Sequence, residues 1–152
     1  MKPIVKPKQG SLPINLKTDD QIEIFIDGAA RGNPGESGIG VLIKETDDKI
    51  REIKKYLGTK TNNQAEYTAL ITALESAQDL KNKKIKIFTD SLLVANQING
   101  LWKVKHPDIV PLNKKAKELL KTYLSVSIQH VPREQNSEAD RLANLAIDEY
   151  HS

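Results

Sequence analysis

Four carboxylate side chains occupy positions in this sequence where they could act together. Asp27 and Asp90 each follow an apolar segment with a strand-like pattern, IEIFI and KIKIFT. Glu66 and Asp140 each lie near the start of a segment with helical spacing. Carboxylate oxygens are hard ligands, so a set made only of them favours Mg²⁺ or Mn²⁺ over zinc. The four residues are therefore candidate ligands for divalent cations and candidate catalytic groups.

Taken one at a time, each of these acidic residues also has a purely local explanation. Asp27 precedes Gly28, as an aspartate in a turn would. The other three fit helix capping. Glu66 lies three residues after Asn63, as a capping-box glutamate would, and Asp90 could cap the helix that follows it. Asp140 could lie in the first turn of a helix capped by Ser137. Singly, these explanations are sufficient.

The predicted orientation of the four side chains argues for a joint role. On its predicted helix, each of the two first-turn carboxylates shares a face with apolar residues. Glu66 shares one with Leu70, Ala73 and Ala77, and Asp140 shares one with Ala143 and Ile147. A capping residue does not need to face inward. Asp27 and Asp90 follow apolar strands, at the usual location of sites in sheets covered by helices. Carboxylates that converge there repel one another, and divalent cations offset that repulsion.

A sheet and its covering helices must bring these residues together. Three successive strands are predicted in IEIFIDG, GIGVLIKE and IREIKKYLG, as an antiparallel meander. Helices are predicted over 62–80, 92–100, 107–122 and 136–150, and short strands over 84–90 and 125–131. The order βββαβααβα predicts an α/β fold with a five-stranded mixed sheet, three antiparallel strands and then two more, covered by helices. Five of the eight glycines fall between Gly28 and Gly40, which predicts tight turns there.

The composition is that of a single globular domain. The chain has 152 residues, of which 38% are hydrophobic and 28% charged. Residues 1–20 hold three of the seven prolines and four lysines without apolar periodicity, so we expect a basic arm or linker before a domain over 21–152. No cysteine is present, which excludes disulfides, thiolate nucleophiles and cysteine-ligated zinc, and a cytoplasmic location is expected. The apolar runs are of strand length, so no membrane association is expected.

Positive charge is concentrated in one part of the chain. The net charge is only +3, but residues 103–121 contain six lysines against two acidic residues, a local balance of 6 − 2 = +4. A polyanion would be attracted to this stretch. A solvated, lysine-rich helix face would have the same composition, so charge alone does not identify a nucleic-acid partner.

Four sequence motifs resemble the successive active-site motifs of type 1 ribonucleases H, in the same order. They are IDGAARGNPG, TNNQAEYTAL, FTDSLLV and NSEADRLA, spread over residues 22–150. The resemblance implies a ribonuclease H-like fold and an endonuclease that hydrolyses the RNA strand of RNA/DNA hybrids. It also implies that Asp27, Glu66, Asp90 and Asp140 bind two Mg²⁺ or Mn²⁺ ions when substrate is present. The products would carry 5′-phosphate and 3′-hydroxyl ends.

The same resemblance suggests which residues contact the substrate. In the family, short amide side chains and backbone groups contact the 2′-hydroxyl of the RNA strand. The matching positions in this sequence are Gly28, Asn33, Asn62, Asn63 and Gln64. Each of these could equally serve a turn or a helix cap. The sequence lacks the long basic insertion of many bacterial members, and GLWKVKHPDIVPL resembles the shorter form. Hybrid binding would then rely on Trp102, Lys103 and Lys105, although a lone tryptophan is also a common core residue.

Two further positions depart from the family pattern. Leu92 follows TDS where relatives often carry a polar residue, so one substrate contact is expected to be missing. The catalytic-loop histidine of many members has only His130 as a counterpart, in QHVPREQN. His130 could instead be structural, with Arg133 or Glu134 nearer the metal ions.

Other functions remain open at this point. A domain of this fold that has lost or changed its activity could serve as a nucleic-acid-binding module, although the presence of all four carboxylates argues against it. The chain could also be a ribonuclease H module of a larger polyprotein or reverse transcriptase, with residues 1–20 as its linker. Double-stranded RNA is a second candidate partner beside the hybrid, and a monomer is expected.

Overall fold

A five-stranded mixed sheet forms the centre of the computed structural model, which describes residues 21–152. The strands are β1 (Gln21–Gly32), β2 (Gly35–Lys44), β3 (Ile50–Lys60), β4 (Lys84–Thr89) and β5 (Ser125–His130). Their order across the sheet is β3-β2-β1-β4-β5. The pairs β1·β2 and β2·β3 are antiparallel, whereas β1·β4 and β4·β5 are parallel. This confirms the predicted meander followed by two further strands. The arm predicted for residues 1–20 lies outside the described residues.

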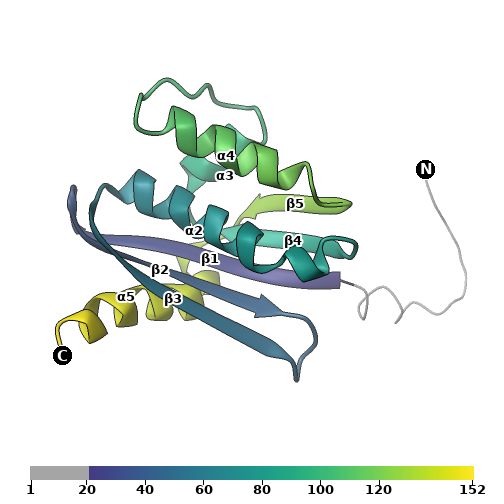
Figure 1. Ribbon diagram of the computed structural model, residues 1–152, viewed down its shortest axis with the longest axis horizontal. Helices are drawn as coiled ribbons and strands as arrows, with labels where there is room; N and C mark the ends of the chain where they lie inside the picture. The colour runs from purple at the N-terminus through teal and green to yellow at the C-terminus, as the bar shows by residue number, and fades with distance from the viewer. Residues whose placement is uncertain (1–20) are drawn as a thin grey trace, which may run out of the picture.

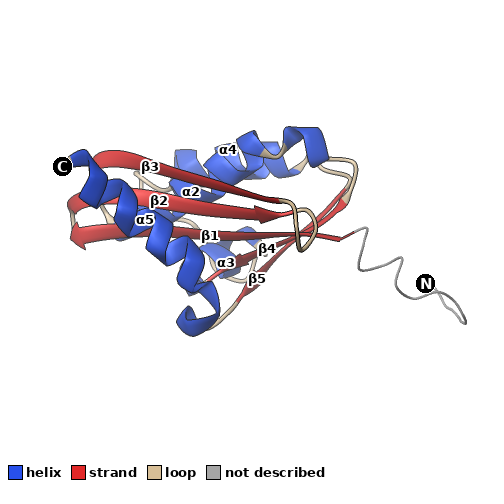
Figure 2. Ribbon diagram, turned by 90° about the horizontal axis from the view of Figure 1, so that it is seen from below, coloured by secondary structure: helices blue, strands red, loops and turns tan. Residues whose placement is uncertain are grey.

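Helices cover both faces of the sheet. They are α2 (Asn62–Ser76), α3 (Leu92–Ile98), α4 (Val110–Leu120) and α5 (Ser137–Tyr150), and short 3-10 helices lie at Gln78–Leu80 and Arg133–Asn136. Figure 1 shows α2, α3 and α4 on one side of the sheet and α5 on the other. Seen from below in Figure 2, α5 crosses the face of the antiparallel strands. No helix within residues 21–152 has the length and apolar character needed to cross a membrane.

The core lies between the sheet and α2. Alternation in β1 places Ile22, Ile24 and Ile26 on the α2 face, where at most 3% of each is exposed. Helical spacing in α2 turns its apolar residues toward them, including the fully buried Leu70 and Leu74. Burial of these aliphatic side chains contributes roughly 1.5–3 kcal/mol each, so this layer provides much of the stability of the fold.

The helix predicted over 107–122 is shorter in the structure. It begins at Val110 and ends at Leu120, with Pro111 in its first turn. Proline lacks an N–H group and clashes with the preceding turn, so it is tolerated in the first turn of a helix and not farther inside. The position of Pro111 therefore explains why α4 cannot begin at residue 107.

Glycines in the antiparallel strands permit close helix packing, and the prediction of tight turns between Gly28 and Gly40 is only partly right. Gly32 and Gly35 do flank the β1–β2 turn, but Gly38 and Gly40 lie within β2. A Cβ atom at Gly38 would come within 2.6 Å of the Ala143 carbonyl oxygen, and one at Gly40 within 2.2 Å of the Ala139 carbonyl oxygen. The missing side chains let the backbone of α5 rest directly on β2.

Adding a methyl group at this contact should therefore destabilise the protein. We expect Gly40→Ala to force α5 away from β2 and to cost about 1–3 kcal/mol, as overpacking of a core does. At this chain length the melting temperature should fall by about 2–4 °C per kcal/mol. Gly58→Asn is the control for steric overlap, because within residues 21–152 no atom lies within 4 Å of its added Cβ. Its cost is backbone strain alone, and asparagine adopts the positive φ of Gly58 more readily than most residues do. Equal melting temperatures for the two variants would contradict this account of the packing.

Candidate active site

Two of the candidate carboxylates lie side by side in the centre of the sheet. The parallel pairing of β1 with β4 ends at Ile26 and Thr89, and the next residues are Asp27 and Asp90. β1 itself continues to Gly32, paired with β2, so Asp27 is a buried residue within a strand and the turn explanation is wrong. The capping explanation for Asp90 is also wrong. Ser91 caps α3, since its Oγ accepts a hydrogen bond from the Val94 N–H at 3.2 Å.

The third carboxylate, Glu66, is held against β1 by a backbone hydrogen bond. Thr61 and Gln64 form the capping box of α2, with the Gln64 N–H donating to Thr61 Oγ1 at 3.1 Å and the Thr61 N–H to Gln64 Oε1 at 2.9 Å. The capping-box explanation for Glu66 is therefore wrong. Instead, the Gly28 N–H donates to Glu66 Oε1 at 2.9 Å. A Cβ at Gly28 would lie 2.3 Å from the Ala65 carbonyl carbon, so only glycine allows α2 to approach this closely.

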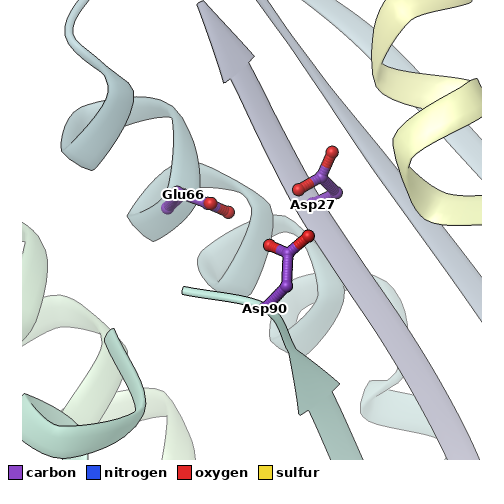
Figure 3. Close-up of side chains that lie close together, drawn as sticks. All are labelled: Asp27, Glu66 and Asp90. Atoms are coloured by element: carbon purple, nitrogen blue, oxygen red, sulfur yellow. The ribbon is translucent and has the colours of Figure 1, made fainter. Parts of the chain in front are cut away.

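These three carboxylates converge from three elements. Oxygens of Asp27, Glu66 and Asp90 all lie within 4.8 Å of one another. Figure 3 shows the three side chains, from β1, α2 and the end of β4, pointing toward a common centre. Such a cluster has the donor set and the spacing that a divalent cation requires.

Burial and mutual repulsion dominate the electrostatics of the cluster. Burial and the neighbouring carboxylates Glu66 and Asp90 raise the pKa of Asp27 to about 10. Burial and Asp90 raise the pKa of Glu66 to about 8, although the Gly28 N–H acts in the opposite direction. A bound cation would reverse both effects, because it stabilises the ionised form of each carboxyl group. The residues therefore fit a divalent metal ion.

Asp140, the fourth candidate, stands beside this cluster and is more open to solvent. It lies in the first turn of α5, and its side chain is 32% exposed. Its carboxyl group is close enough to Asp27 for a hydrogen bond between the two when one is protonated. The predicted Ser137 cap is wrong, since the N-cap residue is Asn136 and no side chain caps the helix.

Asn136 tethers α5 to β1, a role that was not predicted from the sequence. It is 1% exposed, and its Nδ2 donates to the Ile26 carbonyl oxygen at 2.8 Å. This bond joins the start of α5 to β1 at the residue before Asp27, and so sets the distance between Asp27 and Asp140. The motif NSEADRLA contains the signal, because an asparagine four residues before the carboxylate is placed to cap or to tether the helix.

A polar cleft of about 510 Å³ surrounds the four carboxylates. Of the predicted RNA contacts, Gly28, Asn62 and Asn63 line it. The other two stabilise local structure, because Asn33 Oδ1 accepts from the Asn62 N–H at 3.0 Å and Gln64 belongs to the capping box. Arg31 and Asn144 also line the cleft, although neither was singled out from the sequence.

Trp102, Lys103 and Lys105 lie away from the carboxylates. They line a second hollow of about 500 Å³, between the segment after α3 and the helix α4, together with Lys114 and Lys117. Trp102 is 46% exposed, so it is not a core residue. The hollow combines an accessible aromatic ring with four lysines, a composition that suits a nucleic-acid backbone. Leu92, at the position that departs from the family, is 47% exposed.

The two candidate loop residues differ in their relation to the cleft. His130 is the last residue of β5, is exposed, and does not line the cleft. Arg133 does line it, with Nη2 3.9 Å from Asp140 Oδ1 and a side chain that is 80% exposed. Glu134 lies beside it in the same 3-10 helix. Arg133 is therefore the better placed of the two to meet an anionic substrate.

Comparison with known proteins agrees with this geometry. Residues 25–146 match the family described as reverse transcriptase-like. The chain is 40% identical to ribonuclease HI of Halobacterium salinarum over 147 residues, 96% of this chain and 69% of that protein. It is 41% identical to the bifunctional protein Rv2228c of Mycobacterium tuberculosis, covering 84% of this chain but 36% of that protein.

Solved structures give the same result. The crystal structure of the Halobacterium salinarum enzyme has a TM-score of 0.80 at 43% identity, with 85% of this chain and 98% of that chain covered. LC11-RNase H1 in complex with an RNA/DNA hybrid has a TM-score of 0.81 at 39% identity, with 86% and 99% covered. The fold, the family model and the 40% identity to a ribonuclease HI over 96% of this chain lead to one conclusion: this chain belongs to the type 1 ribonuclease H family.

Proposed function

We propose that this chain is an endonuclease that hydrolyses the RNA strand of RNA/DNA hybrids with the help of divalent cations. The observation that carries the proposal is the convergence of Asp27, Glu66 and Asp90 in a polar cleft, beside Asp140, where burial and mutual repulsion raise the pKa of Asp27 and of Glu66. The relatives named as ribonucleases, and the LC11 enzyme bound to a hybrid, support the same substrate class.

The four carboxylates would hold two Mg²⁺ or Mn²⁺ ions around the scissile phosphate. When bound, such ions neutralise charge on the phosphate and lower the pKa of an attacking water, which would yield 5′-phosphate and 3′-hydroxyl ends. The chain's part is to keep the ligands in place. Glu66 is oriented by the Gly28 N–H, and Asp27 is held in a strand paired on its β2 side. Arg133, at the exposed rim of the cleft, would attract the phosphate.

Both strands of a hybrid would have a place on this surface. Backbone and short amides of Gly28, Asn62 and Asn63 line the carboxylate cleft and could bond the 2′-hydroxyl of the RNA strand, which is both donor and acceptor. The lysine-lined hollow at Trp102, Lys103 and Lys105 would bind phosphates of the duplex outside the cutting site.

The direct test is cleavage of end-labelled substrates. Wild-type protein should cut the RNA strand of a hybrid with Mg²⁺ or Mn²⁺ and stop when a chelator is added, and Asp27→Asn should be inactive. Single-stranded RNA, double-stranded RNA and duplex DNA serve as parallel substrates. Chelator-resistant cleavage, or intact hybrid after incubation with wild type and metal, would overturn the proposal.

Replacing the carboxyl group of Asp27 should also change stability. When the metal-free protein folds, Asp27 must either take up a proton or repel its neighbours, which is why its pKa is raised to about 10. Asp27→Asn preserves shape and removes this cost, so the metal-free variant should melt above wild type. We expect about 1 kcal/mol, or a rise of roughly 2–4 °C. With several millimolar Mg²⁺ the order should reverse, because wild type gains more from binding. Melting curves with chelator and with Mg²⁺ test both halves, and a metal-free variant that melts below wild type would show that repulsion at Asp27 is not what limits stability.

The lysine-lined hollow predicts a change in salt dependence. Lys103→Ala with Lys105→Ala should weaken hybrid binding and flatten its dependence on salt by roughly 0.7–0.9 log units per lost phosphate contact. Turnover at saturating hybrid should change little, since neither lysine lines the carboxylate cleft. Binding measured over a range of salt concentrations provides the slope, and an unchanged slope would mean that these lysines are only solvated surface residues.

His130 and Arg133 can be separated by a pair of alanine variants. Arg133→Ala should lower kcat more than His130→Ala, because only Arg133 lines the cleft. Both residues are exposed, so melting temperatures should change by little. A large loss of kcat for His130→Ala at unchanged melting temperature would reverse the assignment.

A further inference from the structure

A chain of polar contacts runs from β1 through α5 to the fourth carboxylate. Asn144 lies one turn after Asp140, and its Nδ2 donates to the Asp140 carbonyl oxygen at 3.0 Å and to Asp140 Oδ1 at 3.3 Å. Arg31 Nη2 donates in turn to Asn144 Oδ1 at 3.2 Å. Its Nη1 forms an ion pair with Asp148 Oδ1 at 2.8 Å. The order of contacts is thus Asp148, Arg31, Asn144 and Asp140.

Arg31 determines which end of the Asn144 amide faces the carboxylate. A guanidinium group has donors and no acceptor, so it binds the oxygen of an amide and not the nitrogen. With Oδ1 bound to Arg31, Nδ2 is directed at Asp140. If the amide turned over, an oxygen would face the carboxylate and repel it. The ion pair with Asp148 limits the movement of Arg31 itself.

Asp140 has less local support from the backbone than Asp27 or Glu66. Asp27 lies within a paired strand and Glu66 accepts the Gly28 N–H, whereas Asp140 is partly exposed on the first turn of a helix without a side-chain cap. Its Oδ1 is held by Asn144. With all carboxylates ionised, its Oδ2 has no hydrogen-bond donor within residues 21–152, and so it is available to a cation.

We propose that Asn144 is a positioning residue that orients the Asp140 carboxylate, that Arg31 fixes the orientation of Asn144, and that the pair thereby sets the affinity of the acidic cluster for a divalent cation. The inference rests on the proposed function of the cluster. It concerns residues that act through Asp140 and do not themselves contact the ion. Partners of this kind typically change metal affinity or activity by about 10–100-fold when they are removed.

The test measures Mn²⁺ binding by calorimetry on the protein without nucleic acid, for Asn144→Ala, Arg31→Ala and the double variant. Alanine is a good helix former, so Asn144→Ala should fold. The matched control is Lys54→Ala, because Lys54 Nζ pairs with Glu149 Oε1 at 3.1 Å and likewise joins α5 to the sheet, without contact to Asn144. Thermal unfolding shows how far each variant changes the fold itself.

We expect Asn144→Ala to weaken Mn²⁺ binding about tenfold. Arg31→Ala should also lower the affinity for Mn²⁺, but by a smaller factor. The double variant should bind Mn²⁺ as tightly as Asn144→Ala does, because Arg31 acts through Asn144. Lys54→Ala should bind as wild type does. In the hybrid assay, the Mg²⁺ concentration for half-maximal activity should rise by the same factor for Asn144→Ala, while KM for the hybrid stays within about twofold.

If wild type binds Mn²⁺, three results would overturn the inference about Asn144 and Arg31 and leave the proposed metal site intact. They are unchanged affinity in Asn144→Ala, an equal loss in Lys54→Ala, which would indicate a general effect of tethering α5, and losses that multiply in the double variant. A wild-type protein that binds no Mn²⁺ would overturn the proposed metal site, and this inference with it.

Discussion

Direct contact between helix backbone and sheet backbone is the constraint on which the rest of this structure depends. At Gly28 the chain of β1 touches the first turn of α2, and at Gly40 the chain of β2 touches the first turn of α5. A side chain at either point would separate a helix from the sheet. Because Glu66 directly follows Ala65 and Asp140 directly follows Ala139, the two residues at these contacts, the same contacts decide whether the carboxylates reach the neighbourhood of Asp27.

This close packing creates an electrostatic cost that other parts of the fold must offset. Burial favours the neutral form of a carboxyl group, and neighbouring carboxylates favour it further, as the raised pKa values of Asp27 and Glu66 show. The apolar layer between β1 and α2 provides the free energy that holds the charges together. The cleft is therefore organised before any cation arrives, which is the arrangement expected of a site that must bind one without large movement.

The sequence predicted the fold well because the patterns were strong and local. Alternation in IEIFI and helical spacing in 62–80 depend only on neighbouring residues, and the element order followed from them. The predictions were wrong where the role of a residue depends on tertiary packing. Gly38 and Gly40 carry no sign in the sequence that a helix rests on them, and Thr61 took the capping role that had been considered for Asn63. Arg31 and Asn144 are far apart in sequence, and only the tertiary structure shows that they share a hydrogen bond.

The unequal lengths of β1 and β4 have a consequence for solubility. β1 continues from Asp27 to Gly32 beyond the last residue paired with β4, so within residues 21–152 one edge of its backbone has no neighbouring strand there. An unpaired edge can recruit a strand from another molecule and start aggregation. Here α2 lies over that edge through the Gly28 N–H, and the acidic cluster stands beside it. An approaching strand would have to displace a helix and to bury polar carboxyl groups further, which disfavours strand pairing at this edge.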